Sequence, residues 1–384
     1  MRASTIVGVI ALGLILAVAF AIVFPWEYLT GFIPSGANDS EIINAIRLPD
    51  GFSIDVYARV AGARSLVLSE SGTLFVGTRG DKVYAVTQTG DVIKVARNLN
   101  SPNGVALKGG DLYVAEISRI IRFNDIENNL ASSDYEVVFD GYPKNALHGW
   151  KYIAFGPDGL LYVPVGAPCN ICSPEEPYAT ITRLNVSDPA GFEIIAWGVR
   201  NTVGFDWNPT TNTLWFTDNG RDWLGNNAPP DELNAISKQR PHFGYPYCHG
   251  GTIQDPKFDL FDCSAFEQPA RALGPHVAAL GMTFYTGTQF PSTYHGDVFI
   301  AEHGSWNRDA PIGYRIMRVS VENNKAQSYE VFAEGWLKNS VALGRPVDVI
   351  VTPFGSLLVS DDKAGLIYEI GYGSVLGTLP FSII

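Results

Sequence analysis

Six stretches of the chain share one pattern of apolar and polar positions. Each has a Gly or Asn turn, then a short apolar run that in most of them holds an aromatic residue, and then a small or polar residue. Turn residues on both sides of a short apolar run are typical of a buried strand. The six stretches are residues 72–77, 110–115, 159–164, 212–217, 296–301 and 355–360. The sequence therefore contains an internal repeat of strands.

Most of these strands are followed by a second one in which polar and apolar residues alternate, as at 82–86, 119–123, 181–184, 314–319 and 365–370. The pairs recur about every 55 residues, which is the length of a four-stranded propeller blade. The sequence predicts an all-β fold, a six-bladed β-propeller of four-stranded blades. Two β-sandwiches are the alternative, although sandwiches do not require one signature in every unit. A long insertion in the fourth unit, residues 219–295, is expected to build the binding surface.

The first residues carry a different pattern. An uncharged apolar run extends from residue 6 to residue 24, close to the ~20 residues that cross a bilayer as a helix. Arg2 is the only charge before the run, which places the rest of the chain outside the cytoplasm. A cleaved signal peptide is the alternative to a retained anchor, because small residues at 17, 19 and 21 have the spacing of a cleavage site.

These patterns divide the chain into four segments. We expect a membrane anchor or signal segment at residues 1–29, a spacer at 30–41, the propeller at 42–373 and a C-terminal tail at 374–384. A buried core helix at the N-terminus is disfavoured because the run is apolar on every face. The propeller would then lie outside the cytoplasm, in the periplasm or at the cell surface, or be secreted after cleavage.

The composition agrees with a folded, turn-rich protein. Of the 384 residues, 46% are hydrophobic and only 17% are charged, which excludes a disordered chain. The 39 Gly and 24 Pro supply many tight turns. The formal net charge of -12 disfavours binding to a phosphate backbone, so we expect no nucleic-acid partner.

The four cysteines are consistent with an oxidising compartment. Cys169 and Cys172 are close neighbours in a Pro-rich loop, while Cys248 and Cys263 bracket a longer stretch. Of the three possible connectivities we favour the two local disulfides, Cys169 with Cys172 and Cys248 with Cys263. A zinc site that includes Cys169 and Cys172 is the competing interpretation.

Cationic side chains in the loops indicate the chemistry of a candidate site. Arg200, Arg308, Arg345 and Lys363 lie in loops that leave different repeats. If they converge, they suit a small polyanion, because Arg binds carboxylates bidentately and Lys adds a point charge. The alternative for each arginine is an ion pair that ties neighbouring loops together.

Two histidines and two asparagines complete the set of candidates. His148, in a loop before a predicted strand, suits a general base, with a packed or capping histidine as the alternative. His303 lies in the polar loop after the strand of the fifth repeat. Oxygen-rich turns around Asn226 and Asn227 favour a hard cation such as Ca²⁺ over zinc, with solvated turns as the alternative. No segment has the spacing of a zincin, an α/β-hydrolase elbow or a P-loop.

Several motifs, in order, make residues 44–373 resemble the glucose/sorbosone dehydrogenase family. The most specific are LHGW at 147–150, WGVRN at 197–201, PDELN at 230–234, FGYPYC at 243–248, AEHGSWNR at 301–308, GRPVD at 344–348 and SDDKAG at 360–365. The cysteine loop and residues 302–306 look most like the sorbosone and pyranose dehydrogenase branch. The resemblance implies a six-bladed propeller that binds pyrroloquinoline quinone (PQQ) and oxidises sugars.

The same resemblance implies a role for each candidate. His148 would take the proton of the sugar C1 hydroxyl while hydride passes to the quinone, and Arg200 and Asn201 would donate hydrogen bonds to the quinone oxygens. A Ca²⁺ ion would bridge cofactor and protein through main-chain oxygens near Asn226 and Asn227. The other expected cofactor-binding residues are Arg308, Arg345, Lys363 and His303.

The chain departs from the family pattern in two places. Glucose dehydrogenases of the family have an acidic residue where this chain reads Gly166, Ala167 and Pro168, so no aspartate partner for His148 is implied. They also have a second arginine two positions after the first, where this chain has Val347. Glucose specificity is therefore not implied.

Together these observations predict a membrane-anchored, extracytoplasmic quinoprotein that oxidises an aldose or related sugar at C1. The electrons would pass to an external acceptor, a quinone or a cytochrome. Two alternatives stay open: a Ca²⁺-dependent lactonase-type hydrolase on a similar propeller, and a non-catalytic propeller that binds peptides or glycans. The hydrolase would need converging Asn, Asp and Glu ligands but no ring of cations.

Overall fold

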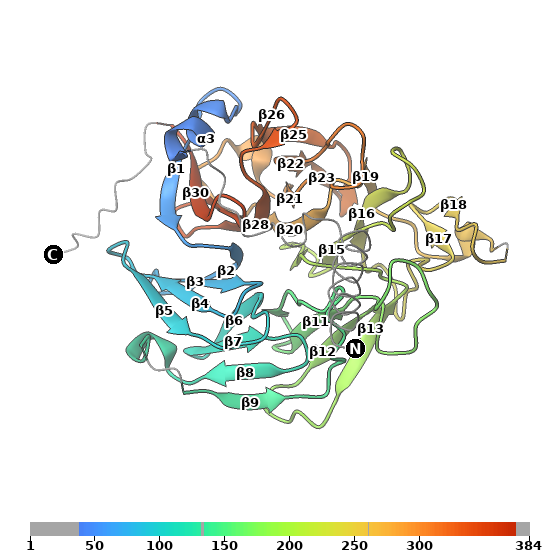
Figure 1. Cartoon of the computed structure of the whole chain (residues 1–384), viewed down its shortest axis with the longest axis horizontal. Coiled ribbons are helices and arrows are strands. Elements are labelled where there is room, and N and C mark those ends of the chain that lie inside the picture. Colours follow the sequence, from blue (N-terminus) through green and yellow to red (C-terminus); the bar gives the residue numbers. More distant parts are fainter. Residues whose placement is uncertain (1–37, 132–133, 260, 374–384) are drawn as a thin grey trace, which may run out of the picture. The chain divides into compact units, whose positions relative to one another are not determined.

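The repeats fold into six four-stranded antiparallel sheets arranged around one axis (Figure 1). This computed structural model describes residues 38–131, 134–259 and 261–373, and it confirms the predicted six-bladed propeller. The predicted membrane or signal segment at 1–29 and the tail at 374–384 lie outside the described residues. Within the described ranges no helix is long and apolar enough to cross a membrane.

Each blade is given from its first to its last strand. Blade 1 consists of β2 (Ala63–Leu68), β3 (Leu74–Thr78), β4 (Val83–Val86) and β5 (Val92–Ala96). Blade 2 consists of β6 (Gly104–Lys108), β7 (Asp111–Ala115), β8 (Ile120–Phe123) and β9 (Glu136–Phe139). Blade 3 consists of β10 (Ala154–Phe155), β11 (Leu161–Val165), β12 (Thr180–Leu184) and β13 (Phe192–Trp197).

The second half of the ring repeats this order. Blade 4 consists of β14 (Phe205–Trp207), β15 (Leu214–Asp218), β16 (Pro230–Ala235) and β19 (Arg271–Pro275). Blade 5 consists of β20 (Ala279–Phe284), β21 (Val298–Glu302), β22 (Arg315–Val319) and β25 (Glu330–Glu334). Blade 6 consists of β28 (Pro346–Val351), β29 (Leu357–Asp361), β30 (Leu366–Tyr372) and β1 (Phe52–Arg59).

Short elements decorate the blades. The helix α3 (Asp39–Ala45) begins inside the predicted spacer and is capped by the Asn38 side chain. The 3₁₀ turns are η1 (Ile126–Asn128), η2 (Cys263–Ala265) and η3 (Ser292–Tyr294). Three two-stranded hairpins are β17 (Cys248–His249) with β18 (Ile253–Gln254), β23 (Val321–Glu322) with β24 (Lys325–Ala326), and β26 (Leu337–Lys338) with β27 (Val341–Ala342).

The ring is closed by a strand from the other end of the sequence. β1 pairs antiparallel with β30, so that Phe52 lies opposite Tyr372 and Arg59 opposite Leu366. Blade 6 therefore contains the first and the last strands of the propeller. β1 covers the outer edge of β30, whose backbone N–H and C=O groups would otherwise be exposed.

The repeat found in the sequence corresponds to the second strand of each blade. β3, β11, β15, β21 and β29 are buried at every position. Both faces of these strands are covered by neighbouring blades, so nearly every side chain is apolar. This double burial explains why the second strands stand out as continuous apolar runs.

First strands are less visible in the sequence because they crowd around the axis. A Cβ on Gly281 of β20 would lie 2.1 Å from Asp348 Oδ1, so only glycine fits there. The prediction that residues 219–295 form one insertion in the fourth unit is wrong, because this range includes β20, the first strand of blade 5. The extra segment of blade 4 is shorter, residues 236–270 between β16 and β19, and it holds β17 and β18.

Antiparallel order brings two sets of loops to the same end of the propeller. These loops join the second strand to the third, or the fourth strand to the next blade, because each strand reverses the direction of the one before. The candidate residues in such loops are His148, Arg200, Asn201, Asn226, Asn227, His303, Arg308, Arg345 and Lys363. The topology therefore places all of these loops at one end.

Candidate functional site

His148 lies in the loop between blades 2 and 3, with a left-handed backbone φ of 53°. Its side chain is 8% exposed, and Nδ1 lies 2.8 Å from the carbonyl oxygen of Ala167. The neighbouring Gly166 admits no side chain, since a Cβ there would lie 2.6 Å from the Cβ of His148. On the other side, Nζ of the buried Lys151 donates to the carbonyl of Gly149. The imidazole is thus held in one place.

These contacts define the protonation of His148. A carbonyl oxygen only accepts, so Nδ1 carries the hydrogen and Nε2 carries the lone pair. Burial, the nearby Arg200 and Arg79 lower the pKa of His148 to about 3, while the bond to Ala167 opposes the shift. The ring is therefore neutral, with an acceptor nitrogen. The Ala167 carbonyl takes the place of the acidic partner that the sequence lacks.

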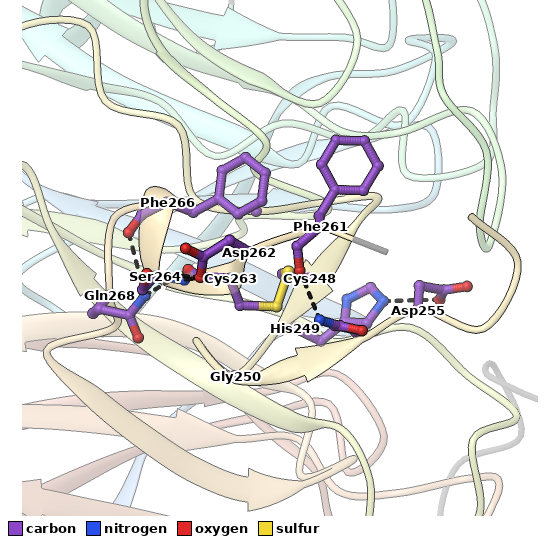
Figure 2. Close-up of a disulfide and its surroundings, with 12 residues drawn as sticks. Cys248, His249, Gly250, Asp255, Phe261, Asp262, Cys263, Ser264, Phe266 and Gln268 are labelled. Atoms are coloured by element: carbon purple, nitrogen blue, oxygen red, sulfur yellow. Dashed lines mark hydrogen bonds and ion pairs between the residues drawn. A yellow bond between two sulfur atoms is a disulfide. The ribbon is translucent and has the colours of Figure 1, made fainter. Parts of the chain in front are cut away.

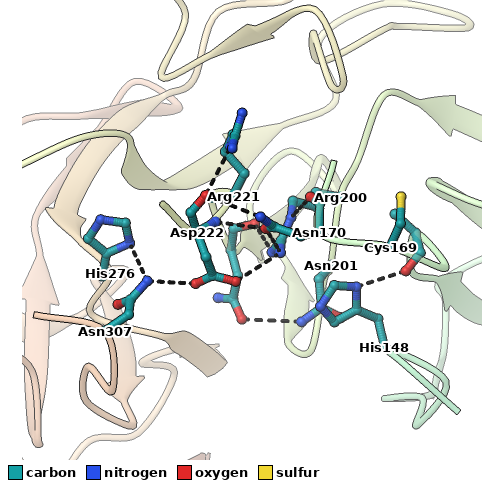
Figure 3. A network of polar contacts seen from close by, with 12 residues as sticks. His148, Cys169, Asn170, Arg200, Asn201, Arg221, Asp222, His276 and Asn307 are labelled. Carbon is teal, nitrogen blue, oxygen red and sulfur yellow. Dashed lines mark hydrogen bonds and ion pairs between the residues drawn. The ribbon is translucent and has the colours of Figure 1, made fainter. Parts of the chain in front are cut away.

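Arg200 is 4% exposed and is fixed by the loop that the Cys169–Cys172 disulfide closes (Figure 3). Its Nε donates to the carbonyl of Asn170 at 2.9 Å, and Nη2 donates to the Asn170 side chain at 2.9 Å. Nη1 donates to the carbonyl of Asn219, and Nη2 also lies 3.4 Å from Asp222. These four bonds leave one of the five guanidinium N–H donors for a ligand.

Asn201 lies between His148 and Arg200. The carboxylate of Asp218 accepts the backbone N–H groups of both Arg200 and Asn201, which fixes the turn that presents them. The Asn201 side chain donates to Asn219 Oδ1 at 3.3 Å. Burial, with a further contribution from Glu232, raises the pKa of Asp218 to about 8. Its structural role therefore rests on the two backbone hydrogen bonds and not on a negative charge.

A second cluster joins blades 5, 6 and 1. His303 Nε2 lies 2.9 Å from Asp362, and the other oxygen of Asp362 accepts a bond of 2.6 Å from the buried Arg64. Arg345 donates to the carbonyls of His303 and Gly304. Burial and Arg345 lower the pKa of His303 to about 4, against the opposing effect of Asp362. Although burial opposes ionisation, His303 and Arg64 lower the pKa of Asp362.

Further hydrogen bonds extend the two clusters to neighbouring blades. Arg64 Nε donates to Asn103, which donates in turn to the carbonyl of Lys151 beside His148. On the opposite side, Asp222 accepts from Asn307 at 2.7 Å, which links the loops of blades 4 and 5 (Figure 3). Loops of all six blades take part. Residues far apart in the sequence therefore meet around one centre.

Arg308, Asn226 and Asn227 lie in loops of blades 4 and 5, where Arg308 and Asn226 contact each other. Arg308 donates to the carbonyl of Asn226, and Asn226 and Asp309 exchange two further bonds. Asn227 is exposed. A Ca²⁺ ion bound to the Asn226 carbonyl would compete with the Arg308 guanidinium for that oxygen. No cluster of three or more His, Cys, Asp or Glu side chains suited to a metal occurs within the described residues. The roles of Arg308, Asn226 and Asn227 stay predictions.

Lys363 contributes its backbone N–H, which donates to Asp361 at 3.0 Å. The side chain of Arg345 is fixed by the two carbonyls of the neighbouring loop. Both residues flank Asp362, in the second cluster. The predicted roles of Lys363 and Arg345 in cofactor binding stay predictions.

Several residues of the site were missed in the sequence. Arg79, which stacks on the Trp150 ring at 3.8 Å, follows the second strand of blade 1 as His303 follows that of blade 5. Superposing the repeats could have found it. Arg64 and Asn170 carry no such signal, because Arg64 lies within a first strand and Asn170 within the disulfide loop.

The donor set fits a planar polyanion. Buried cationic or hydrogen-bonding groups come from several blades, and Arg79 and Arg200 both act electrostatically on His148. In addition, the buried Nε1 of Trp150 and Oγ1 of Thr202 have no hydrogen-bond partner in the part of the chain that the structure describes. Buried polar atoms seldom stay unpaired, so these two mark places where a ligand could bind.

The extra segment of blade 4 supports the site from outside. Its Cys248–Cys263 disulfide, which confirms the favoured pairing together with Cys169–Cys172, holds the hairpin that carries His249 (Figure 2). His249 Nε2 lies 2.9 Å from Asp255, and Asp255 also accepts a bond of 2.7 Å from Arg221. Arg221 in turn donates to the carbonyl of Asp222. The hairpin thus anchors the loop that contacts Arg200.

A model of the TrAA12-like family matches residues 46–372, nearly the whole propeller. The chain belongs to this family. An uncharacterized protein of Borreliella burgdorferi is 34% identical over 358 residues, which are 87% of this TrAA12-like chain and 93% of that protein. A pyrroloquinoline quinone-dependent sugar dehydrogenase of Hypocrea jecorina is 24% identical over 302 residues, which are 61% of this chain and 69% of that protein. The resemblance seen in the sequence is confirmed at the level of the family.

Solved structures share the fold of this TrAA12-like chain. A calcium structure of a Trichoderma reesei enzyme of Carbohydrate-Active Enzymes Family AA12 has a TM-score of 0.75 at 21% identity, covering 85% of this chain and 97% of that chain. The holo form of the PQQ domain of a Coprinopsis cinerea pyranose dehydrogenase has a TM-score of 0.72 at 18% identity, with the same two shares covered. At these identities the likeness shows the fold alone.

Proposed function

We propose that this protein oxidises an aldose or a related sugar at C1, with PQQ as its cofactor. The observation that supports this most is the state of His148: a buried, neutral imidazole with Nδ1 fixed and Nε2 able to accept a proton. The positive charges of Arg200 and Arg79 act on it, and such groups suit an anionic cofactor. Family membership supports sugar oxidation in general, since a relative in Hypocrea jecorina is a PQQ-dependent sugar dehydrogenase.

The chain's own residues would then act on the sugar. His148 Nε2 takes the proton of the C1 hydroxyl once that oxygen lies within about 3 Å, and Nδ1 stays bonded to the Ala167 carbonyl. The remaining N–H of Arg200 and the Asn201 amide stabilise negative charge that develops next to them. When bound, PQQ supplies a two-electron acceptor for the C1 hydride. Arg345 and Lys363 would supply positive charge for its carboxylates.

Reconstitution tests this proposal. We expect purified protein to reduce a dye in the presence of an aldose only after PQQ has been added. Replacing His148 (His148→Ala) should lower turnover by about 10²- to 10⁴-fold and leave quinone binding nearly unchanged. The control is His295→Ala, because His295 is exposed in the loop between β20 and β21, at the other end of blade 5. Unchanged turnover in His148→Ala would remove this residue from the mechanism.

The same assay separates the alternatives. Turnover of a lactone without quinone would support the hydrolase, and sugar binding without turnover would support a non-catalytic propeller.

The Ca²⁺ requirement is tested by titrating the ion into wild type and Arg308→Met. We expect tighter Ca²⁺ binding in the variant, because the guanidinium that contacts the Asn226 carbonyl is gone. Equal affinity would show that Ca²⁺ does not use that oxygen.

We also propose that residues 1–29 anchor the propeller outside the cytoplasm, where a quinone or cytochrome would accept the electrons. Two disulfides support an oxidising compartment. Membrane fractionation, followed by protease treatment of intact cells, tests the proposal. Recovery of the uncleaved chain in the cytosolic fraction would contradict it.

A further inference from the structure

Two tryptophans lie on the loops beside the Arg200 cluster. Trp223 is 66% exposed, Trp306 is half-buried, and their ring centroids are 5.3 Å apart with an interplanar angle of 86°. Trp223 directly follows Asp222, and Trp306 directly precedes Asn307. Asn307 donates to Asp222 (Figure 3), so the two tryptophans next to these residues lie where the blade 4 and blade 5 loops meet.

Both loops hold their tryptophan at fixed points. Both backbone groups of Asp222 are hydrogen-bonded. Its N–H donates to the Asn170 side chain at 2.8 Å, and its carbonyl accepts from Asn170 and Arg221. Two residues after Trp223, the carbonyl of Gly225 accepts from His276 at 2.8 Å. Between these anchors Trp223 has a backbone φ of 70°, which is rare for a bulky residue.

Trp306 is anchored in a similar way. The backbone N–H of Ser305 donates to Ile312, and the Tyr314 hydroxyl donates to the carbonyl of Ser305 at 2.6 Å. On the other side, the Asn307 side chain is bonded to Asp222. Trp223 and Trp306 thus each lie between anchored neighbours, and a residue whose backbone is already fixed loses less entropy on binding. Backbone strain like that at Trp223 usually reflects function.

We propose that Trp223 and Trp306 form a subsite for a second pyranose ring, the one attached to the sugar that is oxidised. The inference rests on the proposed function, in which the reducing-end ring lies at His148. The C–H face of a pyranose is apolar and slightly positive, so it packs well on the negative face of an indole. The preferred substrates are then oligosaccharides with a free reducing end.

The exposed fractions of these residues support a subsite outside the reaction centre. His148 and Arg200 are 8% and 4% exposed, Asp222 is half-buried, and Trp223 is 66% exposed. Exposure therefore rises from Arg200 through Asp222, which it contacts, to Trp223. A chain of sugar rings that leaves the centre by this route would pass over the indole pair.

Binding to the protein without quinone tests the subsite. Cellobiose, maltose and D-glucose are titrated into wild type, Trp223→Ala and Trp223→Tyr, with isothermal titration calorimetry as the readout. We expect the Kd of at least one disaccharide to rise about fivefold in Trp223→Ala, and Trp223→Tyr to restore most of the affinity. The Kd of D-glucose should stay unchanged. Thermal melting of each variant checks that it is folded.

The control is Phe354→Ala. Phe354 is 67% exposed, like Trp223, but lies in the loop between β28 and β29, at the other end of blade 6. This variant should bind all three sugars as wild type does. The proposal is overturned if wild type binds neither disaccharide, if Trp223→Ala binds both as tightly as wild type, or if D-glucose is weakened as much as the disaccharides.

Failure of the subsite and failure of the proposed function are distinguishable. If no sugar reduces the dye in reconstituted protein but disaccharide binding still depends on Trp223, the proposed function is wrong and the subsite stands. If reconstituted wild type oxidises sugars and Trp223→Ala keeps the same ratio of disaccharide to D-glucose kcat/KM, the subsite is wrong and the proposed function stands.

Discussion

At the scale of single residues, the two nitrogens of His148 have different tasks. Nδ1 is fixed on the Ala167 carbonyl, which leaves Nε2 as the acceptor. The backbone φ of 53° is rare outside glycine, and the His148 Cβ lies so close to Gly166 that no side chain fits there. These two features and the Ala167 carbonyl fix the imidazole without an acidic partner.

The charge of Arg200 is expected to control the pKa of His148. Burial contributes most to the lowering of that pKa to about 3, and Arg200 follows. Replacing Arg200 with glutamine removes a positive charge, so the pKa of His148 should rise toward 6.5, measured by NMR titration of the imidazole protons. Arg183→Gln is the control, because Arg183 is paired with Asp158 and Glu193 on the outside of blade 3. An unchanged pKa in Arg200→Gln would show that Arg200 does not lower the pKa of His148.

Asn170 positions Arg200 without belonging to any motif. Its carbonyl and side chain accept from Nε and Nη2 of Arg200, as a carboxylate would, but without negative charge. In Asn170→Ala one acceptor is lost and the guanidinium can turn. We expect turnover of the reconstituted enzyme to fall by about 10- to 100-fold, because small displacements of a catalytic group are costly.

The control for Asn170→Ala is Asn185→Ala. Asn185 caps a turn between β12 and β13, at the other end of the same blade. Its loss should change stability slightly and leave turnover unaltered. If both variants keep full turnover, Asn170 has no positioning role.

At the scale of elements, the two disulfides differ in what they hold. Cys248 and Cys263 are separated by 15 positions and clamp a hairpin, whereas Cys169 and Cys172 are separated by 3 and close the loop of Asn170. Loop-closure entropy gives about 3 kcal/mol of stability for the longer loop and about 2 kcal/mol for the shorter one. Only the shorter loop contacts Arg200 directly.

Replacing each cysteine pair with serines separates stability from function. We expect the Cys248 and Cys263 double variant to lose more free energy of unfolding, measured with urea, than the Cys169 and Cys172 double variant. The second variant should lose more turnover, because it frees Asn170. The opposite order of turnover would show that the hairpin, through Asp255 and Arg221, controls the site.

The elements were predictable to different degrees. The second strands of the blades are doubly buried and appear as apolar runs, so the sequence repeat located all six. The first strands contain glycines such as Gly281, where the next blade approaches closely, and they resemble loops. Blade 5 was therefore assigned without its first strand.

At the scale of the whole molecule, the propeller depends on closure of the ring. Phe52 of β1 contacts four aromatic rings, those of Phe290, Tyr294, Phe332 and Tyr372, with centroids 4.7 to 5.3 Å away. These rings belong to blades 5 and 6 and the loops around them. The strand contributed by the N-terminal side is thus fastened to the C-terminal blades by aromatic packing as well as by backbone hydrogen bonds.

Phe52→Ala should weaken the whole propeller. Loss of a large aromatic side chain from this cluster is expected to cost about 3 kcal/mol of unfolding free energy, measured by urea denaturation. Phe354→Ala, which truncates an exposed ring, should change it by less than about 0.5 kcal/mol. A similarly small effect of Phe52→Ala would show that backbone pairing of β1 with β30 is sufficient for closure.

The sequence by itself determined the repeat and the number of blades, and it favoured the two disulfides that form. The repeat follows from local burial, and each disulfide joins cysteines that are near in the sequence, so both signals are carried by short segments. Only the tertiary structure decided which residues of the candidate site touch. Asn170 contacts Arg200 across 30 positions of sequence, Arg308 contacts Asn226 across 82, and Asp362 contacts Arg64 across 298. Such contacts depend on how the blades close around the axis, and no local pattern of residues encodes that geometry.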